Sequence, residues 1–114
     1  MKNTAIEIFS TPGTRLSRCA PWVELDANPL RPHAGQKLGI TYVAHRNVPV
    51  EVRIYTVQGD FVHEFEGLSG TGSISRRVNW DGKDWMGNWV PVGMYLVEFK
   101  TGGFQMVRKV EVAK

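Results

Sequence analysis

One loop of the sequence holds most of the residues that could bind a metal or a partner. Between two segments of alternating apolar residues, it carries two carboxylates, Asp81 and Asp84, and three large apolar side chains, Trp85, Met86 and Trp89. Carboxylate oxygens are typical ligands of Ca²⁺. Trp and Met are enriched where proteins contact one another. The loop is therefore the first candidate for a functional site.

The two carboxylates, with Asn88 beside them, form a weak calcium candidate. An EF-hand loop offers more oxygen ligands and closes with a glutamate, and this loop does neither. Aspartate in a turn commonly accepts a hydrogen bond from a backbone N–H two residues further on. We therefore expect Asp81 and Asp84 to stabilise turns, and we expect neither a metal nor a cofactor.

The three apolar side chains of the loop admit more than one interpretation. Trp85, Met86 and Trp89 can form the hot spot of a protein interface, or they can fold back as a cap on the end of the domain. We expect at least one of them to contact a partner. A reading from a different class is a carbohydrate-binding module, in which Trp85 and Trp89 provide a platform for sugar rings.

The sequence shows no arrangement typical of an enzyme. The three histidines, His33, His45 and His63, are scattered, and no pair has a metal-ligand spacing on one element. The Gly-x-Ser-x-Gly elbow of serine hydrolases is missing. The single Cys, Cys19, excludes an internal disulfide. We therefore expect no catalytic residues and no enzymatic activity.

The charge of the chain is low and spread out. The formal net charge is +3, with six Lys/Arg against three Asp/Glu in residues 1–49 and eight of each in residues 50–114. Nucleic-acid binding needs clustered basic residues, so we expect no such partner.

No apolar run reaches the ~20 residues of a membrane helix, and residues 1–10 lack the apolar region of a signal peptide. An exported protein would therefore need a leader that this chain does not contain.

The elements that position the loop are expected to be strands. Gly or Pro interrupts nearly every window long enough for a helix, whereas apolar and polar residues alternate repeatedly. Trp80 and Tyr95 fall at inward positions, so we expect both to be buried, with the Tyr95 hydroxyl bonded to the backbone. We expect a Gly/Ser loop over 67–72 and a hairpin turn at 58–60. The predicted strands cover 4–9, 22–25, 37–43, 50–57, 61–65, a segment from Ile74 to Trp80, 94–100 and 105–112.

Seven to nine short strands of this spacing predict an antiparallel β-sandwich of the immunoglobulin or fibronectin type III kind. The boundary is expected near Asn28, with a sandwich domain over 28–114 and an N-terminal extension or strand arm over 1–27. In that arm, Ile6, Ile8 and Phe9 belong to a short alternating strand. Such a strand can add to the edge of its own sandwich or to that of a neighbouring subunit.

A run of residues in the second half resembles a known family. Trp80-Asp81-Gly82, Asp84, Gly87, Val90-Pro91, Gly93 and Tyr95 stand in an order similar to that of the immunoglobulin-like domain of the flagellar hook-capping protein family. Related C-terminal modules of secreted bacterial proteins, including type IX secretion sorting domains, share it. The chain departs from the pattern at Thr56, where the family usually has Asp. The resemblance implies an appended, non-catalytic module that contacts other proteins at the cell surface.

Together these observations predict a structural or protein-interaction module of an exported, cell-surface or appendage assembly. Its expected partners are other protein subunits, including further copies of the chain joined by strand addition. The alternative remains carbohydrate binding through the loop tryptophans. An extracellular or cell-surface location is favoured over a cytoplasmic one.

Overall fold

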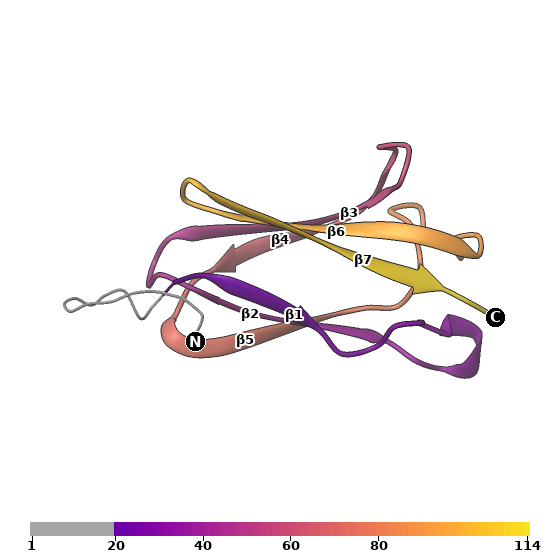
Figure 1. Cartoon of the computed structure of the whole chain (residues 1–114), viewed down its shortest axis with the longest axis horizontal. Coiled ribbons are helices and arrows are strands. Elements are labelled where there is room, and N and C mark those ends of the chain that lie inside the picture. Colours follow the sequence, from indigo (N-terminus) through magenta and orange to yellow (C-terminus); the bar gives the residue numbers. More distant parts are fainter. Residues whose placement is uncertain (1–19) are drawn as a thin grey trace, which may run out of the picture.

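A computed structural model describes residues 20–114, which form two antiparallel β-sheets packed face to face (Figure 1). The three-stranded sheet has the order β1-β2-β5 and the four-stranded sheet the order β4-β3-β6-β7. A short 3-10 helix, η2, precedes β2, and no helix of the described part is long and apolar enough to span a membrane. The elements are β1 (Trp22–Leu25), η2 (Pro32–Ala34), β2 (Leu38–Ala44), β3 (Pro49–Thr56), β4 (Phe61–Ser69), β5 (Gly72–Trp80), β6 (Gly93–Thr101) and β7 (Phe104–Val112).

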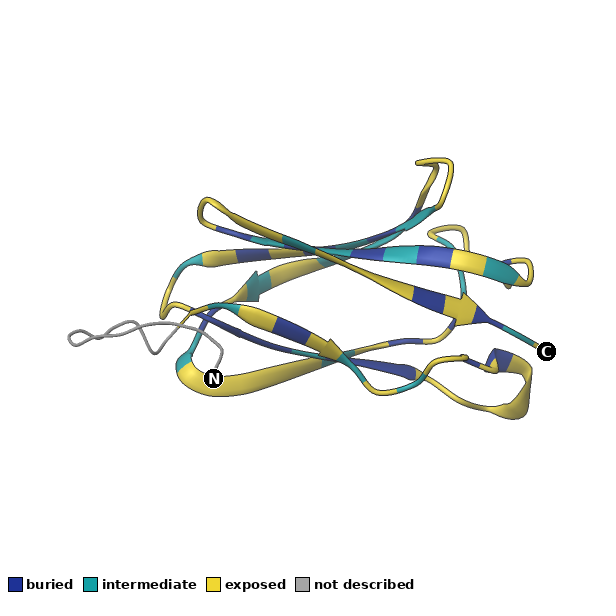
Figure 2. Cartoon of the chain, in the orientation of Figure 1, coloured by how far each residue is buried: buried dark blue, intermediate teal, exposed yellow. Residues whose placement is uncertain are grey.

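The expected antiparallel sandwich is thus confirmed, with seven strands in the described residues. Its core lies between the sheets because successive side chains of a strand point to opposite faces. In β3, Val52 and Ile54 are fully buried while Glu51 is exposed, and β6 repeats the pattern with Val97 and Phe99 (Figure 2). The alternation seen in the sequence therefore reports burial on one face of each central strand.

Trp80 is the largest fully buried side chain, as expected from its alternation with Val78. Its ring meets that of Tyr95 edge-on, with 5.9 Å between the centroids. The Tyr95 hydroxyl donates a 2.6 Å hydrogen bond to the carbonyl of Pro91. Both sequence predictions for these aromatic residues are confirmed.

The two sheets are joined along one lateral edge by the segment before η2. Leu30 is fully buried, its N–H donates to the carbonyl of Glu111 at 2.7 Å, and its carbonyl accepts from Ala113 at 2.8 Å. The side-chain carbonyl of Asn28 accepts a further bond from the Glu111 N–H. These three hydrogen bonds attach the segment between β1 and η2 to the end of β7.

Part of the predicted N-terminal extension belongs to the sandwich. β1 pairs along its whole length with β2, from Trp22 opposite Val43 to Leu25 opposite Ile40. Residues 1–19 lie outside the described residues, so for them the extension stays a prediction. Cys19 and the strand arm of Ile6, Ile8 and Phe9 fall in that range.

The predicted Gly/Ser loop over 67–72 is shorter than expected. β4 continues to Ser69 and β5 begins at Gly72. Gly67 has a φ of 73°, and the pairing of β3 with β4 changes register between Val50 and Val52. A bulge of this kind breaks the alternation of period two, so the sequence pattern ends before the strand does.

Candidate functional site

The loop between β5 and β6 lies at one end of the sandwich, beside η2 and the β3–β4 hairpin (Figure 1). A tight turn forms its tip. Asp84 donates its N–H to the carbonyl of Asn88 at 2.8 Å, and the N–H of Gly87 donates to the carbonyl of Asp84 at 2.9 Å. The tip is therefore a small hydrogen-bonded hairpin.

The carboxylates of the loop hold its backbone. Asp84 Oδ1 accepts hydrogen bonds from the N–H groups of Met86, at 2.9 Å, and Asn88, at 3.0 Å. Asp81 Oδ1 accepts from the N–H of Lys83 at 3.1 Å. These are the turn contacts expected from the sequence. Among residues 20–114, no group of three or more His, Cys, Asp or Glu is placed to hold a metal.

Three further hydrogen bonds fix the loop to the sandwich. The buried Trp80 indole donates to the carbonyl of Lys83 at 2.8 Å, and Val90 donates its N–H to Gly82 at 3.0 Å. The N–H of Trp85 donates to the carbonyl of Val62, in β4, at 2.7 Å. The loop is anchored at its base and at its tip, so its backbone has little freedom.

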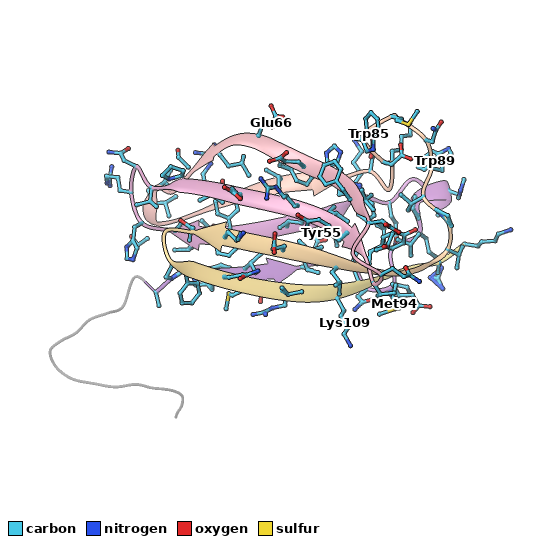
Figure 3. All side chains as sticks on the ribbon, turned by 90° about the horizontal axis from the view of Figure 1, so that it is seen from above. Tyr55, Glu66, Trp85, Trp89, Met94 and Lys109 are labelled. Atoms are coloured by element: carbon cyan, nitrogen blue, oxygen red, sulfur yellow. The ribbon has the colours of Figure 1, made fainter. Side chains whose placement is uncertain are left out.

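Trp85 and Met86 nevertheless leave their side chains in solvent. Trp85 is 66% exposed and Met86 is 65% exposed. Figure 3, seen from above the four-stranded sheet, shows Trp85 at the same end of the molecule as Trp89 and Met94. Most of the surface of these two side chains is thus left uncovered by the described chain.

Trp89 behaves differently and takes the capping role. Its ring centroid lies 4.8 Å from that of His33, in η2, and the Lys83 ammonium lies 4.7 Å from the Trp89 ring centroid. Close approach of the loop to η2 depends on Gly82, because a Cβ there would come within 2.6 Å of Pro32 Cγ. Trp89 thus closes the end of the sandwich over η2, while remaining 46% exposed.

The same end carries four exposed apolar side chains that the sequence analysis did not single out. Phe61 is the first residue of β4 and Met94 the second residue of β6. Val57 and Val92 lie in the adjoining loops. We name the whole set the loop-end cluster: Val57, Phe61, Trp85, Met86, Trp89, Val92 and Met94. Phe61 and Met94 are apolar residues at strand positions that face solvent, where polar residues are expected. This departure from the alternating pattern could have identified them from the sequence.

The histidines do not form a site within the described residues. His33 packs against Trp89 with the two rings tilted, and His63 meets Phe65 edge-on, with 4.7 Å between the His63 and Phe65 ring centroids. His45 lies in the turn between β2 and β3, at the opposite end of the sandwich from η2. The described residues therefore carry exposed apolar side chains at one end of the sandwich, and their histidines are spread over both ends.

Comparison with known proteins gives a similarity of fold. No family model matches the chain, and no curated protein matches it. Among solved structures, the fold is similar to part of PorZ, described as an essential bacterial surface component of the type-IX secretion system of Porphyromonas gingivalis, from the human oral microbiome. The TM-score is 0.56 at 23% identity, over 81% of this chain and 11% of the PorZ chain. This chain thus corresponds to a small part of PorZ, and the likeness shows the fold.

These comparisons support one expectation from the sequence and leave two others without support. They agree with an all-β module of the kind found in a type IX secretion component. They give no support to the flagellar hook-capping resemblance or to the carbohydrate-binding alternative.

Proposed function

We propose that this chain is a non-catalytic module that binds a protein partner through the loop-end cluster, within an exported or cell-surface assembly of a bacterium. One observation carries the proposal. Trp85 and Met86 are about two-thirds exposed, on a loop whose backbone is fixed by hydrogen bonds to Asp84 and to Val62.

A fixed backbone makes such side chains effective anchors. Ordering a mobile side chain on binding costs about 0.5–1.5 kcal/mol, and ordering a loop costs more. The Asp84 turn has already restricted the loop, so only the Trp85 and Met86 rotamers remain to be ordered. Buried Trp anchors are among the residues that contribute ~2 kcal/mol or more at hot spots. The partner expected on this chemistry offers an apolar pocket for an indole ring.

The surface location of the proposed assembly rests on the similarity to PorZ. That protein is described as a surface component of a secretion system, and this chain has the fold of a domain-sized part of it. A module of this fold, with a rigid apolar loop and without a clustered catalytic group in the described residues, suits attachment to other proteins of an assembly.

Site-specific photo-cross-linking in cells of the source organism tests the proposal. A photoreactive amino acid replaces Met86 in one variant and Phe104, an exposed aromatic at the opposite end of the sandwich, in a control variant. We expect a cross-linked adduct with a second protein at position 86 and none at position 104. Adding Trp85→Ala to the first variant is expected to remove the adduct.

Two results would contradict the proposal. Equal adducts at both positions would show that the loop end has no special role. No adduct at position 86, together with quenching of tryptophan fluorescence by a polysaccharide, would favour the carbohydrate alternative instead. Protease treatment of intact cells tests the location, because a surface module is degraded without lysis.

A further inference from the structure

A row of outward side chains crosses the four-stranded sheet near the loop end of the sandwich. Phe61 of β4 lies opposite Tyr55 of β3, Tyr55 lies opposite Leu96 of β6, and Leu96 lies opposite Lys109 of β7. We name these four residues the outer-face row. Successive side chains of a strand point to opposite faces. Because Ile54, next to Tyr55, is buried between the sheets, the row points away from the core.

The outer-face row continues the apolar surface of the loop-end cluster. Phe61 is 45% exposed, and its ring meets that of Tyr55 edge-on, with 6.1 Å between the centroids. Trp85 lies beside β4, because its N–H donates to the Val62 carbonyl on the edge of that strand away from β3. Figure 3 shows Tyr55 between Trp85 and Lys109. The apolar surface therefore extends from the loop across the sheet.

Charged groups limit this surface on one side and at one end. The next row towards the middle of the sheet contains Glu64, Arg53 and Glu98. Arg53 pairs with Glu64 at 3.2 Å, and Glu98 accepts a 2.7 Å hydrogen bond from the side-chain amide of Gln105. Lys109, at the end of the outer-face row, is exposed and forms no ion pair with a described residue. A matching partner presents a narrow apolar stripe with a carboxylate at one end.

The backbone of the sheet decides which kind of segment can carry that stripe. β3 and β6 each pair with a strand on both sides, so their N–H and C=O groups are bonded within the sheet. An extended segment laid on this face would bury backbone groups that find no partner, which is costly. An α-helix bonds its own backbone, and helices commonly cover the apolar face of a sheet.

We propose that the partner docks an amphipathic α-helix across the outer-face row, with an acidic residue facing Lys109. From Trp85 across β4, β3 and β6 to Lys109 the surface spans ~19 Å at the usual spacing of strands, which matches a helix of roughly 13 residues. Its apolar anchors should recur at i, i+3 or i+4, and i+7.

The helix has to come from another protein or from a part of the chain outside the described range. The sole helix among residues 20–114 is η2, with three residues, so the described part of a second copy cannot supply it. We assign the helix to the partner that the loop-end cluster contacts, because the two surfaces are continuous at Phe61. The inference thus rests on the proposed function and names the chemistry of its partner.

Photo-cross-linking in cells of the source organism tests this footprint. A photoreactive amino acid replaces Tyr55 in one variant and Trp22, an exposed aromatic on the three-stranded sheet, in a matched control. We expect the adduct at position 55 to contain the same protein as the adduct at position 86, and no adduct at position 22. Mass spectrometry of the cross-linked peptide should identify a segment with helical spacing of apolar residues and an acidic residue at one end.

Charge reversal tests the end of the row. Lys109→Glu is expected to lower the yield of the adduct at position 55 about fivefold, the size of one exposed ion pair, whereas Lys109→Arg should preserve it. Lys100→Glu, on the same face of β6 but outside the row, is the matched control and should change nothing. Leu96→Glu should remove the adducts at positions 55 and 86, because it places a charge in the middle of the apolar stripe.

The outcomes separate this inference from the proposed function. An adduct at position 86 with none at position 55, or with a different protein there, would overturn the helix across the sheet and leave the loop-end contact standing. A cross-linked segment without helical spacing, or a yield that Lys109→Glu leaves unchanged, would overturn the inference in the same way. Adducts at neither position would overturn both.

Discussion

The four tryptophans of this chain have four different environments. Trp80 is 1% exposed, Trp22 39%, Trp89 46% and Trp85 66%. Burial of Trp80 is predictable from its alternation with Val78, because a strand repeats every two residues. The contact of Trp89 with His33 is not predictable from the sequence, since the two residues are far apart along the chain and meet only when the loop packs on η2.

The contrast between Trp85 and Trp80 gives a prediction about stability. Trp85→Ala removes a side chain that packs against little, so the free energy of unfolding should change by less than about 0.5 kcal/mol. Trp80→Ala leaves a cavity between the sheets and should cost about 3–5 kcal/mol. Urea denaturation followed by far-UV circular dichroism measures both. A loss of several kcal/mol for Trp85→Ala would mean that its indole belongs to the core, and would count against the interface.

Asp84 should act through hydrogen bonds and not through a metal. Asp84→Ala removes the acceptor of the Met86 and Asn88 N–H groups, so their amide hydrogen exchange should become faster. Asp84→Asn keeps an oxygen at that position and should largely preserve their protection. Neither Ca²⁺ nor a chelator is expected to shift the melting temperature of the wild-type chain. A calcium-dependent rise that Asp84→Asn abolishes would instead establish a metal site.

At the scale of elements, the strands were predictable where one face is buried and the pairing is regular. β3 and β6 meet both conditions, and their alternation places Val52 and Phe99 inside as expected. β4 meets neither, because the bulge at Gly67 shifts its register and its outward residues include Phe61. The sequence also could not place β1 in the sandwich, since four residues carry too little pattern to show which strand they pair with.

The three-stranded sheet contains an ion pair whose effect depends on pH. Asp26 follows β1, its Oδ1 accepts the Gly39 N–H at 2.8 Å, and its other oxygen pairs with Arg77 across β2. The backbone hydrogen bond from Gly39, followed by the contact with Arg77, lowers the pKa of Asp26 below its usual 3.8. A depressed carboxyl pKa stabilises the fold above the unfolded pKa, and this contribution is lost as the pH falls through the folded value.

We therefore expect wild type to be more stable than Asp26→Asn at neutral pH, by less than about 1 kcal/mol for this half-exposed pair. The difference should shrink once the pH falls below 3.8. Chemical denaturation of both chains at a series of pH values measures it. Gly39→Ala should also weaken the ion pair, because a Cβ there would displace the flexible ends of both Arg77 and Asp26. A wild-type advantage that persists at the lowest pH would contradict the assignment.

At the scale of the whole molecule, the exposed apolar side chains are unevenly distributed. Seven of them form the loop-end cluster at the end that carries η2 and the β5–β6 loop, while Trp22, Ile74, Phe104 and Val107 lie elsewhere. Scattered exposed apolar residues are normal, whereas a gathered set indicates an interaction surface. The exposed apolar side chains of the described residues are therefore concentrated at one end of the molecule.

The loop-end cluster depends on a sandwich that behaves as one body. One core cluster draws side chains from both sheets, and Leu30 joins the end of β7 to the loop that leads into β2. We expect a single unfolding transition, because neither sheet can keep its inner face buried without the other. Leu30→Ala should lower the free energy of unfolding by about 2–5 kcal/mol, since it empties a fully buried position.

Comparing the unfolding midpoints from near-UV and far-UV circular dichroism tests this expectation. The near-UV circular dichroism of Trp80 reports packing between the sheets, whereas the far-UV signal reports all the strands. In the wild type and in Leu30→Ala, the two midpoints should agree and should shift together. If Leu30→Ala instead separated them, the three-stranded sheet would be opening before the four-stranded one. Trp85 would then still be held on β4 through Val62 while β5 was released.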